Sequence, residues 1–499
     1  MRPGKQTLLT VVLPSIVLIP AIALILNRLM SATTAPSSTR SAIVVGSGLA
    51  GLSAASQLIA HNVPVHLLER AAKPGGNSIK ASSGINGAPT RFQTTQDSLF
   101  YEDTVRSAGN AFKDSKMREC RQKLVTTLTN TSESAVYWLN DEKGVDLSRV
   151  GQLGGHSLPR THRGAGKLPP GAAIVTTLLK SLQQSPLFHL HTGSLVTKVL
   201  KSAESVEGVE YSEGDETKTL HGAVVFASGG FAGDSKGMLA EYRPDLAGFP
   251  STNEAIPGSQ KLLTAVGAQL LDMELVQVHP TGFVDPKNVG ALVKFLAAEI
   301  LRGEGGLLLL NGKRFVNEME TRQHITDVIL STPPVDTSPQ QWDIQLVLDE
   351  GAYNALSSHV DFYIFKGLMR KATVSELDPS GVALPSIQEY AKAAAGLASD
   401  PFSRKTFGSW VLKEVKPDSI VYVGRVTPVV HFTMGGVLIS QDAEVLDADG
   451  KPIKGLWAAG EITGGLHGDN RLGGSSLLEC AVFGRIAGDQ AAAFARSYH

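Results

Sequence analysis

Residues 41–70 read SAIVVGSGLAGLSAASQLIAHNVPVHLLER and carry the clearest structural pattern of the chain. Ala42–Val45 is a short β-branched run, which is typical of a buried strand. Leu49–Ile59 has the composition and length of an apolar helix, and Val63–Leu68 reads as a second strand. Glycines separate the first strand from the helix. The order strand, glycine turn, helix, strand predicts a βαβ unit.

The glycine turn at residues 46–51 has the spacing G-x-G-x-x-G. In such a turn Gly46 permits the tight bend, Gly48 lets the backbone approach a pyrophosphate, and Gly51 lets the helix pack on the strand. Glu69 closes the second strand, where its carboxylate can accept hydrogen bonds from ribose hydroxyls. The motif therefore predicts a dinucleotide, and by itself it leaves NAD and FAD open. The expected contacts are Gly46, Gly48, Leu49, Ala50, Gly51, Glu69 and Arg70.

Composition and charge exclude several classes of protein. The chain has 499 residues, of which 42% are hydrophobic and 19% charged, as in a globular protein of two or three domains. The net charge is −1, so nothing points to nucleic acid as a partner. Cys120 and Cys480 are too few for a disulfide framework, a zinc site or an iron–sulfur cluster. We therefore expect an organic redox cofactor and no metal.

An apolar segment near the N-terminus, Leu8–Leu26, contains no charged residue and is long enough to span a bilayer. We interpret it as a retained signal anchor, followed by a polar tether at residues 31–41. A cleaved signal or targeting sequence is the alternative interpretation. The anchor implies attachment to a membrane of the mitochondrion or the endoplasmic reticulum, and the sequence does not distinguish the two.

The rest of the chain contains two regions that differ in their sequence patterns. We expect helices over residues 99–111 and 117–138, two strands within 187–209, and another strand over 223–227. Residues 274–431 differ, because they contain mixed short elements and a proline-rich loop. The nucleotide-binding signatures thus lie in two blocks that flank a middle insertion.

A glycine- and serine-rich segment follows Glu69, where residues 73–88 read KPGGNSIKASSGINGA. Its backbone can lie against a flat ligand, and its hydroxyls can bond that ligand. This segment resembles the soluble, yeast-type fumarate reductases and the flavocytochrome c flavin subunits, within the succinate dehydrogenase/fumarate reductase flavoprotein family. The similarity covers residues 41–490 and implies non-covalently bound FAD. The flavin contacts that it implies here are Gly76, Asn77, Ser78, Ser82, Ser83, Gly84, Ile85 and Asn86.

Four more segments resemble the same family. Residues 154–163 (GGHSLPRTHR) are similar to the segment beside flavin and substrate, and residues 227–231 (ASGGF) to a glycine pair against the FAD. Residues 459–461 (AGE) and 470–478 (NRLGGSSLL) look like the C-terminal FAD signature, and the carboxylate of Glu461 also suits ribitol hydroxyls. The further FAD contacts implied are Ser228, Gly229, Gly230, Gly460, Glu461, Gly474, Ser475, Ser476 and Leu477.

The resemblance also implies a site for a dicarboxylate, fumarate or succinate. Such a site needs cationic or hydrogen-bonding groups for both carboxylates, a hydride donor on one face and a proton donor on the other. His279-Pro280-Thr281 resembles the family's substrate-binding H-P-T, and His431 its second carboxylate-binding histidine. Arg471 resembles the arginine that clamps a carboxylate, for which a planar guanidinium is suited. The implied substrate-binding residues are His279, Thr281, His431 and Arg471.

The catalytic residues implied by the resemblance are Arg322, Glu299 and Arg302. Arg322 is the proton donor, and Glu299 with Arg302 forms a relay that returns the proton. Arginine is an unexpected acid because its pKa exceeds about 12, but a developing carbanion is a very strong base. Spacing alone predicts something plainer. Glu299 and Arg302 would be an ion pair on a helix surface, His279 a buried histidine with its own partners, and Arg322 a solvated charge.

Three positions depart from the family. Gln323 stands where relatives have an aspartate after the catalytic arginine, which weakens the expected positioning of Arg322. Pro257–Gln260 replaces a T-G-D-G motif on the flavin side of the interdomain region, so turnover or flavin affinity is expected to be reduced. Ala298 replaces a threonine, as it does in the yeast-type enzymes, and no loss of activity is expected from it.

These observations predict an α/β fold. A Rossmann-like FAD-binding domain (residues 41–273 and 432–499) would receive an inserted α+β capping domain (274–431), and residues 1–40 would form the anchor and tether. The predicted activity is FAD-dependent reduction of fumarate to succinate. The alternatives are a relative acting on another enoate, a steroid ketone or aspartate, and a degenerate protein that only binds FAD. The electron donor stays open between reduced flavin and NADH acting through a partner.

Overall fold

The structure is a computed structural model, and it describes residues 1, 4, 41–113, 116–378 and 380–497. The apolar run expected to be an anchor, residues 8–26, lies outside this part of the chain. Among the described residues, no helix combines the length and the apolar character needed to cross a membrane. From Ser41 onward, the described residues form one compact unit.

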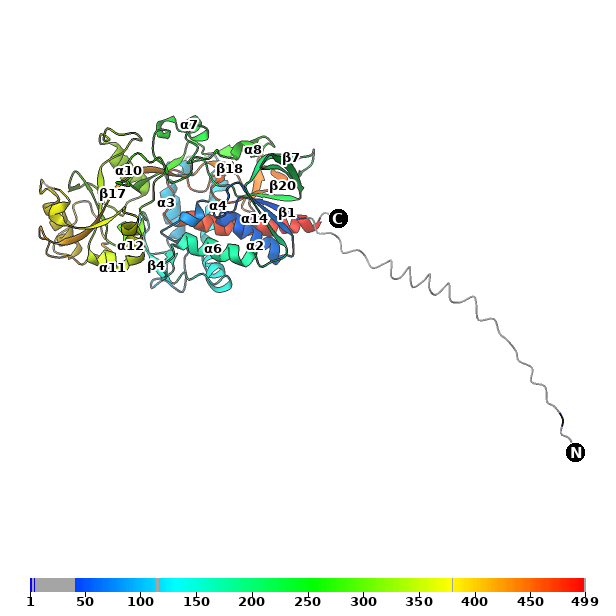
Figure 1. The fold of residues 1–499 in the computed structure, drawn as a ribbon, viewed down its shortest axis with the longest axis horizontal. Helices are drawn as coiled ribbons and strands as arrows, with labels where there is room; N and C mark the ends of the chain where they lie inside the picture. The colour runs from blue at the N-terminus through cyan, green and yellow to red at the C-terminus, as the bar shows by residue number, and fades with distance from the viewer. Residues whose placement is uncertain (2–3, 5–40, 114–115, 379, 498–499) are drawn as a thin grey trace. The chain divides into compact units, whose positions relative to one another are not determined.

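A six-stranded sheet carries the predicted βαβ unit (Figure 1). Its order is β19-β20-β10-β1-β2-β6, and all neighbours are parallel except β19 and β20. Strands β1 and β10 are buried along their whole length, as expected for parallel strands that are covered on both faces. The strands are β1 (Ala42–Val45), β2 (Val65–Glu69), β6 (Phe188–Thr192), β10 (Ala223–Phe226), β19 (Glu444–Leu446) and β20 (Pro452–Ala458).

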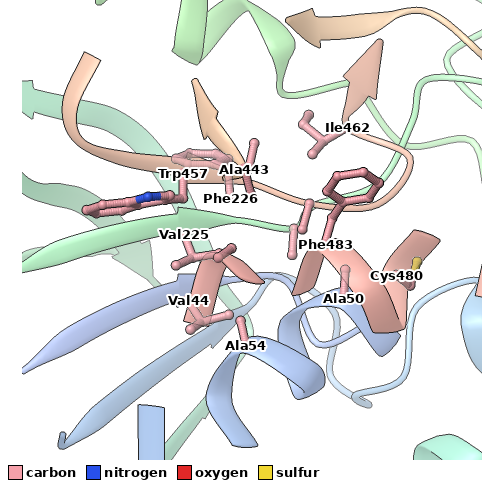
Figure 2. Packing of buried hydrophobic residues seen from close by; sticks show 14 of the residues in the cluster. Val44, Ala50, Ala54, Val225, Phe226, Ala443, Trp457, Ile462, Cys480 and Phe483 are labelled. Carbon is pink, nitrogen blue, oxygen red and sulfur yellow. The ribbon is translucent and has the colours of Figure 1, made fainter. Parts of the chain in front are cut away.

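Two helices from opposite ends of the chain, α2 (Leu49–Ala60) and α14 (Ser475–Ser497), pack against each other beside this sheet. Glycines of α14 permit the close approach. A Cβ on Gly484 would lie 2.5 Å from the carbonyl oxygen of Ala50, and one on Gly488 would lie 2.5 Å from that of Ala54. Figure 2 shows the core that results, which includes Val44, Val225, Phe226, Trp457 and Phe483. The two sequence blocks with nucleotide-binding signatures therefore share one core.

A second six-stranded sheet is built from residues 276–433, and all its pairs are antiparallel. Its order is β12-β17-β15-β13-β14, with β16 also paired to β17. Two buried apolar clusters on this side of the molecule are distinct from the core of the first sheet. The domain boundary expected between residues 431 and 432 falls inside strand β17. The strands are β12 (Val276–Phe283), β13 (Leu307–Leu310), β14 (Lys313–Arg314), β15 (Ile344–Leu348), β16 (Arg370–Thr373) and β17 (Ile420–Thr433).

Three smaller sheets lie beside these two, in the orders β3-β5-β4, β7-β8-β9 and β11-β18-β21. Their strands are β3 (Ile85–Asn86), β4 (Arg149–Gly151), β5 (Thr161–Arg163), β7 (Ser194–Lys201), β8 (Val206–Glu213), β9 (Glu216–His221), β11 (Leu270–Leu271), β18 (Gly436–Leu438) and β21 (Thr463–Gly464). The other α-helices are α3 (Phe100–Lys113), α4 (Arg118–Asn130), α5 (Ser132–Tyr137), α6 (Pro170–Leu182), α7 (Met238–Tyr242), α8 (Gln260–Thr264), α9 (Ile300–Gly303), α10 (Arg322–Leu330), α11 (Glu350–Ala355), α12 (Ser357–Phe365) and α13 (Ala383–Ala394). The 3₁₀ helices are η1 (Ser78–Lys80), η3 (Pro244–Leu246) and η4 (Val374–Glu376), and η2 (Trp138–Glu142) is a π-helix.

Two expected elements are divided in the structure. Residues 187–209 contribute to three strands rather than two, because the chain turns at Gly193, where φ is +68°. The single helix expected over residues 117–138 is interrupted at Thr131. The hydroxyl of Thr131 donates to the carbonyl oxygen of Thr127, a local bond that competes with continuation of the helix.

Candidate active site

The glycine turn between β1 and α2 requires glycine for steric reasons. At Gly46 φ is +103°, and a Cβ would lie 2.4 Å from the carbonyl oxygen of Ala227. A Cβ on Gly51 would lie 2.0 Å from the carbonyl oxygen of Gly46. The turn is thus pressed against the segment that follows β10, where the nearby Gly229 faces open space. A turn of this geometry at a helix N-terminus fits the pyrophosphate of a dinucleotide.

The carboxylate of Glu69 braces this turn. Its Oε2 accepts from the Ser47 N–H at 3.0 Å and from the Ser47 hydroxyl, and its Oε1 accepts from the Ala71 N–H at 2.8 Å. Ser78 brings the next loop against the start of α2, because its hydroxyl accepts from the Leu49 N–H at 3.0 Å. Arg70 reaches another segment and donates to the Pro257 carbonyl at 2.7 Å.

Asn86 ties the N-terminal flavin loop to the C-terminal FAD segment. Its Nδ2 donates to the Gly473 carbonyl at 2.8 Å and to the Ser475 hydroxyl at 3.0 Å, and its Oδ1 accepts from the Thr161 hydroxyl at 2.7 Å. At Gly474 φ is +81°, and a Cβ would lie 2.2 Å from Asn86 Oδ1. Asn86 is fully buried and fully bonded, so it positions the Gly473–Ser475 turn.

The other expected cofactor residues surround the same region. Ser228 accepts a hydrogen bond from the Ser259 hydroxyl at 2.7 Å. Glu461 Oε1 accepts from the Thr433 N–H at 3.0 Å, and burial raises the pKa of Glu461 to about 7. The loop between β2 and β3 contains Gly76, Asn77, Ser82, Ser83 and Gly84, and Ile85 starts β3. The segment after β10 contains Gly229 and Gly230, Gly460 follows β20, and α14 begins with Ser475, Ser476 and Leu477.

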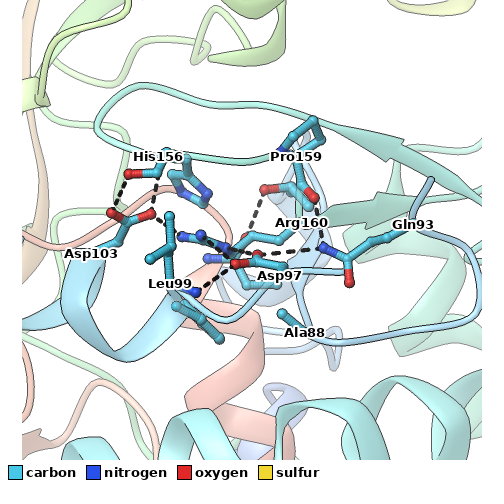
Figure 3. A network of polar contacts seen from close by, with 12 residues as sticks. Ala88, Gln93, Asp97, Leu99, Asp103, His156, Pro159 and Arg160 are labelled. Atoms are coloured by element: carbon cyan, nitrogen blue, oxygen red, sulfur yellow. Dashed lines mark hydrogen bonds and ion pairs between the residues drawn. The ribbon is translucent and has the colours of Figure 1, made fainter. Parts of the chain in front are cut away.

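The loop of residues 154–160 is fixed by a buried arginine (Figure 3). Arg160 is fully buried; its Nε donates to Asp97 Oδ2 and its Nη1 to Asp103 Oδ2, both at 2.6 Å. Asp103 Oδ2 also accepts from the Ser157 N–H at 2.7 Å. His156 lies in this loop, and its Nε2 contacts the Gly473 carbonyl at 3.1 Å. The loop is thereby held against the C-terminal FAD segment.

Glu299 lies at the centre of a buried acid–base cluster. Its Oε2 accepts from Arg322 Nε at 2.6 Å, and its Oε1 accepts from the Gly154 N–H at 3.0 Å and lies 3.6 Å from Arg302 Nη2. Burial alone would raise the pKa of Glu299, but the charges of Arg322 and Arg302 outweigh it and lower the pKa to about 2. The interpretation as a surface ion pair is excluded, because the side chains of Glu299 and Arg302 are each 1% exposed.

The C-terminal FAD segment lies directly against this cluster. A Cβ on Gly473 would lie 2.7 Å from Glu299 Oε2 and 3.0 Å from Arg322 Nη2. The backbone N–H of Glu299 donates to the Ser83 hydroxyl at 3.1 Å, which joins the cluster to the flavin loop as well. The structure thus brings the expected proton-transfer residues next to the expected cofactor residues.

His279 points an unpaired nitrogen into the site. Its Nδ1 accepts from the backbone N–H of Thr281 at 3.2 Å, so the neutral ring carries its proton on Nε2. Nε2 has no hydrogen-bond partner among the residues that the structure describes, and it lies 4.0 Å from Glu299 Oε2. Burial, followed by the charge of Arg322, holds the pKa of His279 well below its usual range. The ring is therefore a neutral donor, and Thr281 supports it.

His431 and Arg471 line the same site. The ring centroid of His431 is 5.4 Å from that of His279, and its Nδ1 lies 2.8 Å from the Thr252 hydroxyl. Arg471 stacks on Phe432, with its guanidinium carbon 4.1 Å from the ring centroid. Burial, and then the charge of Arg322, lower the pKa of Arg471 to about 9. An anionic ligand there would favour the charged guanidinium.

Two positioning residues were missed in the sequence. Gln277 Oε1 accepts from Arg322 Nη1 at 3.0 Å, and its Nε2 donates to Asn470 Oδ1 at 2.8 Å. Asn470 Oδ1 also accepts from the Gln323 N–H at 3.2 Å, whereas the Gln323 side chain donates to Asp327. Gln277 could have been found, because alternate residues of a strand share a face and it stands two before His279. In this chain Arg322 is thus bonded by Glu299 and Gln277, and the Gln323 side chain bonds Asp327.

A family model described as an FAD-binding domain matches residues 41–477 of the chain. Fumarate reductase 1 of Saccharomyces cerevisiae is 44% identical over 476 residues, which cover 90% of this chain and 98% of that protein. The fumarate reductase of Schizosaccharomyces pombe is 40% identical over 474 residues, which cover 90% of this chain and 89% of that protein.

A solved structure, the open conformation of a flavocytochrome c3 fumarate reductase, superposes with a TM-score of 0.70. It is 30% identical in sequence, and the match covers 94% of this chain and 81% of that one. The mixed α/β architecture described above is therefore that of an FAD-binding flavoprotein.

Proposed function

The chain belongs to the family of FAD-binding fumarate reductases, and on that premise we propose that it reduces fumarate to succinate with electrons from a bound FAD. The observation that carries the proposal is the buried cluster of Arg322, Glu299 and His279, together with His431 and Arg471. This cluster offers donors for the carboxylates of a dianion and a proton donor beside them.

The carboxylates of fumarate would be bound by three groups. Arg471 would clamp one carboxylate, because none of the described residues accepts from its Nε although Arg471 is only 3% exposed. His279 would donate from Nε2 to a carboxylate oxygen, since its Nδ1 is already engaged by Thr281. His431 would complete the set, with Thr252 orienting its ring.

The reaction would need a hydride at one alkene carbon and a proton at the other. FAD, when bound, supplies the hydride. Arg322 would give the proton, so that the two electrons of the hydride and two hydrogens convert the alkene to the saturated dicarboxylate. Glu299 contacts Arg322 and faces Arg302, and would return a proton from Arg302 to Arg322. The charge of Arg322 would also stabilise the carbanion character that develops on the substrate.

The same proposal includes a domain division, with residues 41–273 and 432–499 as the FAD-binding domain and 274–431 as a capping domain. The apolar cluster that includes Leu307, Ile387 and Val423 lies wholly within residues 274–431 and supports the division, whereas the larger cluster of the second sheet also contains residues from before 274, such as Phe231 and Leu239. Contacts between the two parts lie at the flavin loop, where Glu299 bonds Ser83 and His359 Nε2 contacts the Ser82 carbonyl at 2.9 Å. Closing such a cap over the substrate would exclude water from the site.

Attachment and electron supply extend the proposal beyond the described residues. The apolar segment at residues 8–26 would anchor the enzyme to a mitochondrial or endoplasmic-reticulum membrane. Electrons would come from reduced flavin, or from NADH through a partner.

Oxidation of reduced methyl viologen tests the activity without knowledge of the natural donor. The purified flavoprotein should oxidise the dye when fumarate is added, and should do so much less with a monocarboxylic enoate, a steroid ketone or aspartate. The Arg322→Ala variant serves as the control for background reaction of the flavin. If the wild-type protein contains FAD and fumarate causes no oxidation, the proposed function is wrong.

A further inference from the structure

Arg302 is held from two sides by residues outside the proposed relay. Its Nη1 donates to the backbone carbonyl of Glu318 at 2.6 Å, and its own backbone carbonyl accepts from Arg404 Nη2 at 2.7 Å. Within the described part of the chain its Nη2 has no hydrogen-bond partner, and it lies 3.6 Å from Glu299 Oε1. The guanidinium is therefore oriented through its other terminal nitrogen, which leaves Nη2 facing Glu299.

Glu318 and Arg404 belong to a buried network of ion pairs. Glu318 Oε2 lies 2.9 Å from Arg404 Nη1 and 2.9 Å from Arg314 Nη2, and Asp400 Oδ2 lies 2.5 Å from Arg314 Nη1. The side chains of Glu318, Arg404 and Asp400 are fully buried. Removing one partner of such a network leaves a buried charge uncompensated. The network is thus buried, and Arg404 joins it to the backbone carbonyl of Arg302.

Arg404 uses all three of its guanidinium nitrogens as hydrogen-bond donors. Its Nη1 bonds Glu318 and the Gly306 carbonyl, its Nε donates to the Thr406 carbonyl at 2.8 Å, and its Nη2 donates to Arg302. A lysine could keep the charge and could not reproduce this planar fork. Glu318 also acts on Arg302 by charge: burial lowers the pKa of Arg302, and the charges of Glu299 and Glu318 oppose that shift.

We propose that Glu318 and Arg404 are positioning residues of the proton relay, which hold Arg302 in the orientation from which it passes protons to Glu299. In each turnover Arg302 gives one proton to Glu299 and regains one from solvent water. The inference rests on the proposed function and extends it to residues that touch neither substrate nor flavin. Asp400 belongs to the same network and lies one step further away, where it bonds Arg314 and the backbone N–H of Arg404.

Three variants test the inference. Glu318→Gln keeps the shape of the side chain and the backbone carbonyl that accepts from Arg302, and it removes the charge that pairs with Arg404 and fixes its guanidinium. Arg404→Lys keeps the charge and removes the fork that reaches the Arg302 carbonyl. Asp400→Asn is the matched control, because it also removes one buried negative charge from this network and leaves the contacts of Glu318 and Arg404 with Arg302 in place. The reaction followed is single-turnover reoxidation of photoreduced enzyme by fumarate, in H₂O and in D₂O.

Glu318→Gln and Arg404→Lys should slow reoxidation by about 10²-fold, as expected for a misplaced catalytic group. Both should increase the solvent isotope effect while flavin content and the fumarate concentration at half-maximal rate stay unchanged. Asp400→Asn should keep the wild-type rate and isotope effect. If Asp400→Asn slows the reaction as much as Glu318→Gln, the network is only structural and the inference is wrong.

Other outcomes separate the inference from the proposed function. If wild-type enzyme is not reoxidised by fumarate, the proposed function itself fails. If wild-type enzyme is reoxidised and both test variants match it in rate and isotope effect, only the positioning role is refuted. Should Glu318→Gln fail to retain flavin, Arg404→Lys decides, because it keeps the ion pair: a wild-type rate and isotope effect overturn the inference.

Discussion

Replacing Arg322 with alanine should abolish the chemical step and leave both ligands bound. Arg322 is 4% exposed and bonds Glu299 through Nε at 2.6 Å and Gln277 through Nη1 at 3.0 Å. Truncation removes the group that would give the proton to the substrate in the proposed mechanism. Flavin should remain, because the Arg322 side chain bonds Glu299 and Gln277 rather than an expected cofactor residue, and fumarate should still be held by His279, His431 and Arg471.

The magnitude follows from the two roles of Arg322. General acid catalysis contributes about 10²- to 10⁴-fold, and Arg322 would also stabilise developing charge, so the loss should reach at least the top of that range. A 10⁴-fold loss corresponds to about 5.4 kcal/mol in the activation free energy. Breaking a buried ion pair also destabilises a protein by about 3–5 kcal/mol. In the variant Glu299 would lose the charge of Arg322 and keep that of Arg302 at 3.6 Å. The pKa of Glu299 should therefore rise.

The assay is single-turnover reoxidation of photoreduced enzyme by fumarate, which isolates the chemical step from the unknown electron donor. Arg322→Lys should recover little of the rate, because lysine keeps the charge and shortens and narrows the donor. Gln323→Ala is a suitable control. It changes the neighbouring residue, whose half-buried side chain bonds Asp327 rather than the site, so its rate should match the wild type.

Reoxidation of Arg322→Ala within about tenfold of wild type would fall well short of the general-acid range. Provided that the variant retains FAD and is folded at the temperature of the assay, this result would show that the proton comes from another group. The proposed mechanism would then be wrong, while the proposed substrate could still be right.

Four further predictions follow from the sequence and the structure. Acid precipitation should release all the flavin into solution, because no histidine for covalent attachment stands between Leu67 and Gly155; a yellow pellet would contradict this. A chain that starts at Ser37 should retain FAD and activity, since the described residues from Ser41 onward form one compact unit, and loss of flavin on truncation would count against it. Thr252→Val removes the hydroxyl 2.8 Å from His431, a bond worth about 1 kcal/mol, so KM for fumarate should rise about fivefold with kcat little changed; an unaltered KM would exclude that support. Burial lowers the pKa of His156 to about 4 from an ordinary value of about 6.5. Its contribution to stability is therefore complete above pH ~6.5 and is lost as the pH falls through about 4, so Tm should fall across this window and His156→Asn should flatten the decline.

The sequence was sufficient for the cofactor fold because its signals are local. The glycines of residues 46–51 occupy fixed positions in one turn, and the structure explains Gly46 and Gly51 by contacts with the carbonyl oxygens of Ala227 and Gly46 that admit no side chain. The alternation of strand, helix and strand over residues 41–70 likewise depends on neighbouring residues. The expected boundaries of helices differed from the structure where a side-chain bond competes with the helix. At Thr131 such a bond divides an expected helix.

The burial and the roles of individual charged residues could not be predicted from local spacing. Spacing alone favoured a surface ion pair for Glu299 and Arg302, whereas both are buried in the structure. Gln323 suggested weakened positioning of Arg322, yet Gln277 and Asn470 hold the neighbourhood of Arg322 from other elements. Such support is invisible in a linear pattern, because each partner is far away along the chain.

By itself the sequence determined the βαβ unit and the dinucleotide site, since both are encoded by short spacings, whereas the residues of a dicarboxylate site were implied only by resemblance to a family. Only the tertiary structure showed which charges are buried and which nitrogen of His279 faces the site. It also showed that Glu318 and Arg404 form hydrogen bonds with Arg302. The physical reason is that burial and electrostatic coupling depend on distances through space. Those distances are set only when segments such as residues 299–302, 318–322 and 471–474 are packed together.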